Sequence, residues 1–312
     1  MTEYIALDSS SIFRAESFAI FNEQRKSNEF CDVTIVANRR KLNAHRKWTT
    51  FSEIEWKTSM HMVSKDDKVF VGGNASSGHA YYLDVLDLKT KQWTSLPLLP
   101  LGQRLHVFHL IAIGQKLYGI SAAQNSWKVD VFDLTTNSWS ELPDQEDGEI
   151  GMQFVALNEC IYAFGQFAEN PEPQVKKLDT RTETWTYVGP MIETREKFNE
   201  VLSYKGKIYM TGNMNNRTVV SEQVRGWNIF VMFDPVKNTW KELTTMVTTM
   251  ENIKLVATTD GIYAIGKPFN LDQSILEFYN IEEDTWSVIG NCSAELGSKQ
   301  VLACAVPNLY FH

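Results

Sequence analysis

Phe132-Asp133-Leu134-Thr135-Thr136-Asn137-Ser138-Trp139 is the stretch that decides the fold. It joins a strand-like segment ending in aspartate to a turn, and then to a tryptophan followed by Ser, Thr or Lys. The same pattern begins at Leu86, Leu178 and Phe233, and in a weaker form at Tyr279. Its tryptophans are Trp93, Trp139, Trp185, Trp240 and Trp286, so the successive steps are 46, 46, 55 and 46 residues. A nearly fixed period of this length predicts a repeat architecture.

Each period from about residue 57 onward contains four strand-like segments. In the third period they cover residues 153–157, 160–165, 175–179 and 184–188, and each is short, apolar or alternating, and bounded by turn residues. Four short strands in each period of ~45 residues are typical of the blade of a β-propeller. The sequence therefore predicts an all-β fold with a ring of repeated sheets.

The two ends of the chain are expected to close this ring. Residues 300–306 and 308–311 resemble the first two strands of another blade, and residues 46–51 resemble a fourth strand because Trp48 precedes Trp93 by one period. The third strand would be missing or supplied by the N-terminal stretch. We therefore expect five full blades and a partial sixth, an arrangement that removes the open sheet edges.

Composition narrows the class of protein. The chain has 312 residues, 43% of them hydrophobic and 22% charged, with a formal net charge of −8. This acidic balance, without a basic run, argues against nucleic-acid binding and against binding to anionic membranes. No window is long and apolar enough to span a bilayer, and no signal peptide is evident. The four cysteines form no CxxC pair and are expected to be reduced, so a cytoplasmic or nuclear location is predicted.

The N-terminal stretch has a different pattern. Apolar residues between positions 12 and 21 predict a helix, and Phe30–Val36 alternates as a strand. Residues 22–26, 30–35 and 44–47 together resemble the first helix, the first hairpin and the entry to the second helix of a BTB domain. The resemblance ends at Lys47. It implies a short α+β, truncated BTB remnant at residues 1–47, preceding the propeller at residues 48–312.

The repeats resemble kelch repeats, whose blades carry a glycine pair after the second strand and a tyrosine and a tryptophan at fixed later positions. Gly72-Gly73 keeps the pair, whereas the second period keeps neither glycine. The Asp-box pattern of sialidases and the Gly-His and Trp-Asp signatures of WD40 blades are absent. The chain thus resembles the BTB-kelch (kelch-like) family, with no BACK region.

This resemblance implies a protein-interaction module. In the family, the kelch propeller recognises the substrate of a Cullin-3 ubiquitin ligase, while the BTB domain holds Cullin-3. Because most of the BTB surface is missing, the resemblance implies substrate recognition more than it implies ligase binding. The alternative is a kelch scaffold that binds actin and the cytoskeleton.

The sequence contains no catalytic constellation. There is no P-loop, GxSxG, HExxH or EF-hand loop. His106 and His109 are three residues apart in a strand-like segment, which places them on opposite faces and disfavours a metal pair. The acidic run at residues 144–149 is interpreted as a solvated loop. We therefore expect no enzyme activity, no cofactor and no metal.

Recognition is expected on the loops of the ring. The fourth period is nine residues longer than the others, and the excess falls between positions 213 and 228. An extended loop with arginine and aromatic residues suits a peptide-binding hot spot, and an insertion without a binding role is the other interpretation. Arg104 and Arg195 open the second and fourth periods, where related propellers hold acidic peptides. The candidate partner-binding residues are Arg104, Arg195, Arg217, Gln223, Arg225 and Trp227.

Overall fold

The computed structural model describes the strands and most of their connections. These are residues 15–22, 30–37, 49–55, 58–74, 80–97, 99–100, 107–123, 126–143, 152–167, 170–192, 197–213, 228–258, 261–268, 271, 274–291 and 301–309. No helix occurs among them, so no helix there could cross a membrane.

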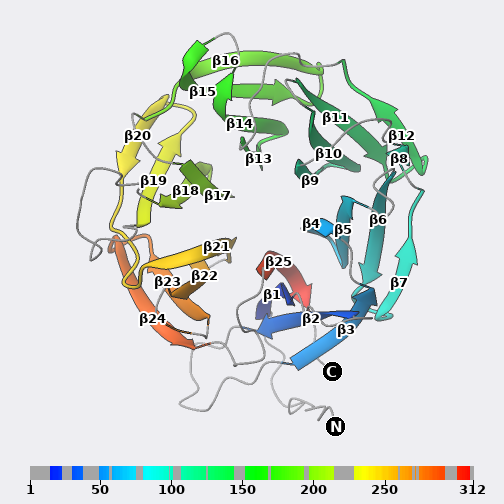
Figure 1. Cartoon of the computed structure of the whole chain (residues 1–312), viewed down its shortest axis with the longest axis horizontal. Coiled ribbons are helices and arrows are strands. Elements are labelled where there is room, and N and C mark those ends of the chain that lie inside the picture. The colour runs from blue at the N-terminus through cyan, green and yellow to red at the C-terminus, as the bar shows by residue number, and fades with distance from the viewer. Residues whose placement is uncertain are drawn as a thin grey trace.

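Five sheets follow one another along the chain and around a ring (Figure 1). The first contains β4 (Thr58–Lys65), β5 (Lys68–Asn74), β6 (Ala80–Asp87) and β7 (Gln92–Ser95), with β8 (Leu99–Pro100) also paired to β6. The second contains β9 (Val107–Ile113), β10 (Lys116–Ala123), β11 (Ser126–Asp133) and β12 (Ser138–Glu141). The third contains β13 (Gln153–Leu157), β14 (Cys160–Phe167), β15 (Asn170–Asp179) and β16 (Thr184–Pro190). The fourth contains β17 (Lys197–Tyr204), β18 (Lys207–Asn213), β19 (Asn228–Asp234) and β20 (Thr239–Glu242). The fifth contains β21 (Met250–Ala257), β22 (Ile262–Pro268), β23 (Ile275–Asn280) and β24 (Thr285–Asn291).

The sixth sheet joins the two ends of the chain. Its strand order is β25 (Val301–Leu309), β1 (Ala15–Asn22), β2 (Phe30–Ala37) and β3 (Thr49–Glu55). Strand β25 is the inner strand of this sheet and pairs antiparallel with β1, from Ser17 opposite Val306 to Asn22 opposite Val301. It also contacts β4 on one side and β21 on the other, which closes the ring.

The hydrophobic core lies between neighbouring sheets, not within one of them. The inner strands contact one another in order around the ring. One buried cluster packs Ile111 and Tyr118 of the second sheet against Ile161 and Leu178 of the third. Three further clusters join the first sheet to the second, the third to the fourth and the fourth to the fifth. Each blade is therefore stabilised by its neighbours, as expected of a repeat protein.

The recurring aspartate and tryptophan have separate structural roles. The aspartate ends the third strand of its blade, and its Oδ1 accepts backbone N–H groups of the following turn, as Asp133 does from Thr135 and Thr136. Four residues after this position, which is Asn280 in the fifth blade, the backbone is left-handed in each of the five consecutive blades, at Lys91, Asn137, Glu183, Asn238 and Asp284. The tryptophan follows on the outer strand, and in the second, fourth and fifth blades it donates its indole N–H to the preceding blade: Trp139 to Pro97, Trp240 to Pro190 and Trp286 to Thr244.

The all-β propeller predicted from the repeats is confirmed, with five sheets built from consecutive segments. Two details of the ends were wrong. The helix expected between residues 12 and 21 is strand β1, and the second strand of the sixth sheet is β1, not residues 308–311. The sixth sheet also has all four strands, because β1 and β2 supply those that the C-terminal segment lacks. The division of the chain at residue 47 stays a prediction, although both sides of it contribute strands to this one sheet.

Candidate functional sites

The two ends of the ring differ in how the strands are connected. Because the four strands of each blade alternate in direction, the turn after the first strand and the turn after the third emerge at the same end. We call this end the turn face. The connections after the second and fourth strands emerge at the opposite end, the connection face. In the first five blades the longer and more variable connections are all at the connection face.

The six candidate partner-binding residues belong to connections that begin and end at the connection face. Arg104 lies between β8 and β9, Arg195 between β16 and β17, and the other four between β18 and β19. All six, like His106, are outside the described residues, so the structure does not test whether they form one site. It does place the strand ends that flank them at the same end of the ring.

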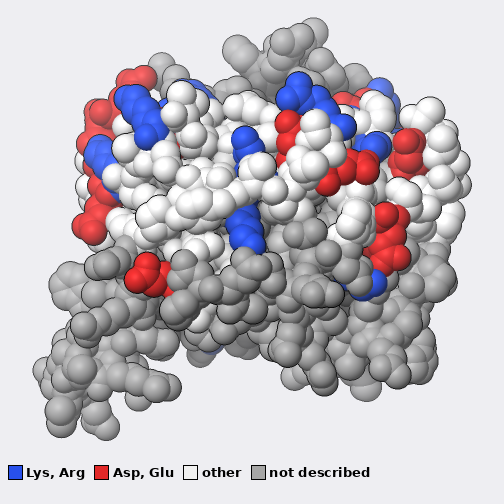
Figure 2. Space-filling model, turned by 90° about the horizontal axis from the view of Figure 1, so that it is seen from above, with Lys and Arg blue, Asp and Glu red and all other residues white. Residues whose placement is uncertain are grey.

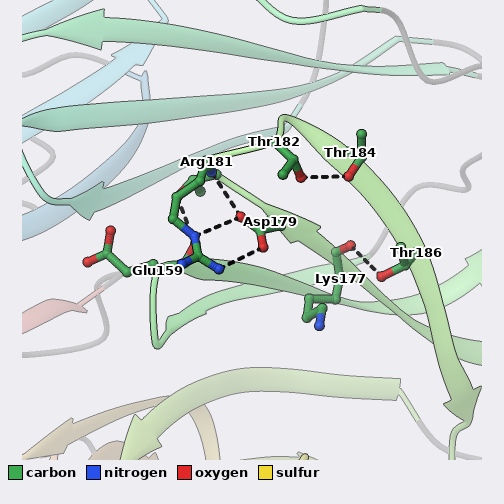
Figure 3. Close-up of polar contacts among 8 residues, drawn as sticks. Glu159, Lys177, Asp179, Arg181, Thr182, Thr184 and Thr186 are labelled. Carbon is green, nitrogen blue, oxygen red and sulfur yellow. Dashed lines mark hydrogen bonds and ion pairs between the residues drawn. The ribbon is translucent and has the colours of Figure 1, made fainter.

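Hydrogen bonds hold the turn face together. In the third blade, Asp179 accepts the backbone N–H of Arg181 at 2.9 Å, and the Arg181 guanidinium folds back to within 3.2 Å of the same carboxylate (Figure 3). The Arg181 side chain, through its hydrogen bonds, holds the pKa of Asp179 at about 2. Beside it, the hydroxyls of Thr182 and Thr184 are 2.8 Å apart. These charges are thus used to stabilise the turn.

Charges of both signs are mixed over the outer surface. Seen from the side of the ring, Lys and Arg side chains lie close to Asp and Glu side chains over the described part (Figure 2). Several form ion pairs, such as Lys89 with Asp67 at 2.6 Å and Lys128 with Glu141 at 2.9 Å. The face seen in Figure 2 shows no single-sign patch among its described residues that would attract a nucleic acid.

A second candidate site lies on the inner strands. The second strands of the five blades can be aligned on a recurring Phe or Tyr: Phe70, Tyr118, Tyr162, Tyr209 and Tyr263. The residues two positions after it are therefore equivalent, and they are Gly72, Ile120, Phe164, Thr211 and Ile265. Each is paired in register with a polar residue of the inner strand. These partners are His61, His109, Gln153, Glu200 and Lys254. We call these five residues the axial layer.

The two histidines of the axial layer contact each other. The ring centroids of His61 and His109 are 4.5 Å apart, and His109 also meets the edge of Phe154 at 5.2 Å. Burial is the main cause that lowers the pKa of both imidazoles, and the positive charge of Lys254 lowers it further. The pKa of His109 is lowered to about 3, so this histidine is uncharged at neutral pH.

An ion pair completes the layer. Lys254 Nζ lies 2.7 Å from Glu200 Oε2, and the two side chains are 20% and 15% exposed. Burial raises the pKa of Glu200, while Lys254 opposes that shift. The layer therefore combines two neutral imidazoles, an amide and a pair of opposite charges on the innermost strands.

These groups can exchange hydrogen bonds and protons with a ligand. Among the described residues, no group of three or more His, Cys, Asp and Glu is arranged to hold a metal ion. The axial layer was not predicted from the sequence, since its members share no residue type. Aligning the periods on their second strands, where Tyr or Phe recurs, would have revealed it.

The comparisons with known proteins support the fold alone. No protein-family model matches the chain, and no curated protein matches it. Among solved structures, it resembles the crystal structure of TolB from Acinetobacter baumannii, with a TM-score of 0.62 and 9% sequence identity. The similarity covers 93% of this chain and 66% of that chain, slightly less than two thirds of its length. This likeness, together with the ring of sheets, defines the chain as a β-propeller.

Proposed function

We propose that the chain is a protein-interaction module that binds a protein or peptide on its connection face. The observation that supports this most is the contrast between the two ends of the ring. One end consists of short turns held by their own hydrogen bonds, and the other receives the long connections, including the one between β18 and β19. Binding residues are concentrated on such loops when a rigid scaffold positions them.

We further propose that this module is a relative of the BTB-kelch proteins and works as a substrate-recognition propeller, in the cytoplasm or nucleus, without catalysis of its own. The repeated aspartate turns and outer-strand tryptophans are the features that favour kelch repeats. Arg104, Arg195, Arg217, Gln223, Arg225 and Trp227 are the residues we propose to contact the partner. Arginine on such a surface would favour an acidic segment, because it can bind a carboxylate through two hydrogen bonds.

A pull-down from cell lysate with the full chain tests this proposal. The variants Arg195→Ala and Arg217→Ala are compared with Arg181→Ala, a matched control on the turn face. We expect one or more partners to bind the native chain and the control but to be lost from the two other variants. The same set of captured proteins with all four chains would contradict a site on the connection face.

The same experiment separates the finer alternatives. Probing the captured proteins for Cullin-3 shows whether the chain joins a ligase or only recognises its substrates; we expect Cullin-3 to be absent. The alternative is an actin-binding scaffold, and it predicts that the chain pellets with actin filaments. Pelleting that is unaffected by Arg195→Ala and Arg217→Ala would favour actin over a peptide substrate.

A further inference from the structure

The axial layer leaves much of its hydrogen-bonding capacity unused. Within the described part of the chain, the side chains of His61, His109 and Gln153 make no hydrogen bond, and Lys254 uses one of its three N–H groups, on Glu200. The polar atoms of these three side chains reach solvent, because none of them is among the buried unpartnered atoms of the described residues, so a ligand can reach them. The partial exposure of Glu200 and Lys254 shows that solvent reaches this layer although it lies on the innermost strands.

We propose that the axial layer is a binding site for a small oxyanion, a carboxylate or phosphate, which accepts hydrogen bonds from Lys254, from the imidazoles of His61 and His109 and from the Gln153 amide. This site is independent of the partner surface proposed on the connection face. Its donors come from four different blades, so the ring itself creates the site.

The charge of Lys254 decides between an anion and a cation. Its positive charge reaches both imidazoles, since it is among the causes that lower the pKa of each. The same charge would repel a metal ion placed between the histidines and would attract an anion. Near neutral pH both imidazoles are uncharged, so Lys254 would supply the positive charge and the imidazoles would supply their N–H groups.

The other charged groups near the layer are known for most of its surroundings. His61 on β4 faces His109 of β9 and the charge of Lys254 on β21, and Lys254 is paired with Glu200 of β17. Strand β13 presents Phe154 to His109. The side chains of β25 are outside the described residues.

Titration with oxyanions tests the site. The probes are inorganic phosphate and acetate, with ionic strength kept constant by chloride, and the readout is the imidazole ¹H–¹⁵N spectrum of the full chain. We expect the signals of His61 and His109, assigned from His61→Gln and His109→Gln, to shift saturably with at least one probe. Acetate should bind equally well at pH 7.5 and pH 6, because the pKa of His61 is well below its usual value and that of His109 is about 3, so neither imidazole gains a proton over this range.

The double variant Glu200→Gln/Lys254→Met provides the test of charge, because it removes both partners and leaves no lone charge. We expect its affinity to fall roughly tenfold, the effect of losing one charge-assisted hydrogen bond. Lys128→Met is the matched control, because it breaks a similar Lys–Glu pair between β11 and β12, and it should bind like the native chain. Thermal unfolding of each variant verifies that it is folded.

Two results would overturn the proposal. One is an absence of saturable shifts at His61 and His109 with both probes. The other is equal binding by the folded double variant and the native chain, which would show that the shifts arise without Lys254. In the first case, a response to zinc would replace the anion site by a metal site.

Discussion

At the scale of single residues, the outer-strand tryptophans link each of the second to fifth blades to the one before it. The ring of Trp286 is buried against Phe230 of the fourth blade, and its N–H reaches the Thr244 carbonyl at 2.9 Å. Trp185 holds the equivalent position in the third blade and packs against Trp127, but it donates no hydrogen bond within the described region. The two positions therefore separate ring packing from hydrogen bonding.

We predict that Trp286→Phe lowers the free energy of unfolding more than Trp185→Phe does. Both changes remove the same ring atoms, but Trp286 is buried whereas Trp185 is partly buried, and only Trp286 loses an interblade hydrogen bond, so the difference should be about 1 kcal/mol or more. Urea unfolding of the two variants measures it. Equal losses would mean that the indole N–H of Trp286 contributes nothing beyond packing.

The histidine pair predicts how stability depends on pH. The pKa of His109 is lowered to about 3 in the folded chain, whereas an unfolded histidine titrates near 6.5. As the pH falls below 6.5, His109 binds a proton in the unfolded state but not in the folded state, so the free energy of unfolding decreases. The expected loss between pH 7 and pH 5 is about 2 kcal/mol for this histidine.

His109→Gln should therefore flatten the dependence of unfolding free energy on pH between 7 and 5, measured in chloride buffer. The aspartates of the turns also stabilise the folded chain, since hydrogen bonds lower their pKa. That contribution is lost in acid as well, but only below about pH 4. Glu200 acts in the opposite direction, because its pKa is raised. An unchanged pH dependence in His109→Gln would mean that this imidazole has nearly the same pKa in the folded chain as in the unfolded chain.

At the scale of the elements, a buried carboxylate anchors the connection from one blade to the next. Glu277 of β23 is fully buried, and its two oxygens accept the backbone N–H groups of Val247 and Thr248, which precede β21. Asp84 and Asp130 hold the equivalent position in the first two blades and are also buried, while the third and fourth blades have Lys176 and Val231 there. The position is thus acidic in three of the five consecutive blades.

Glu277→Val, which copies the fourth blade, should cost about 2–4 kcal/mol of unfolding free energy, because two partly buried N–H groups lose their acceptor. Hydrogen exchange should accelerate at the amides of Val247 and Thr248 in particular. Thr211→Val is the control, since it removes a different buried hydrogen bond, to the Ile229 carbonyl. Unchanged exchange at Val247 and Thr248 would show that water or another group replaces the carboxylate.

The strands differ in how well they could be predicted from the sequence. The aspartate turn and the tryptophan are local signals, so the four strands of the third blade were predicted within five residues at each end. Strand β1 was not, because its short apolar run, with Phe18, Ile20 and Phe21, fits a helix or a strand equally well. Its partner β25 is at the far end of the chain, and no local pattern reports that pairing. The axial layer was missed for a related reason, since it depends on register across five separate strands.

At the scale of the whole molecule, closure of the ring depends on β25. Without this strand, β1 would lose its inner neighbour, and β4 and β21 would each lose a contact. An open ring exposes sheet edges and interblade apolar surface, which favours aggregation. The stability of the molecule should therefore depend on its last strand far more than on an outer strand such as β12.

A chain that ends at residue 300 tests this dependence, with a chain that ends at residue 309 as its control. We expect the longer chain to unfold like the native protein, because it keeps all of β25. The shorter chain should unfold at a lower temperature and form larger species on gel filtration, since the sixth sheet then lacks its inner strand. A synthetic peptide of residues 301–312 should restore the unfolding temperature by pairing with β1 in trans. If the shorter chain remains monomeric with the native unfolding temperature, packing between the other blades is enough to hold the ring together, and β25 is not needed to close it.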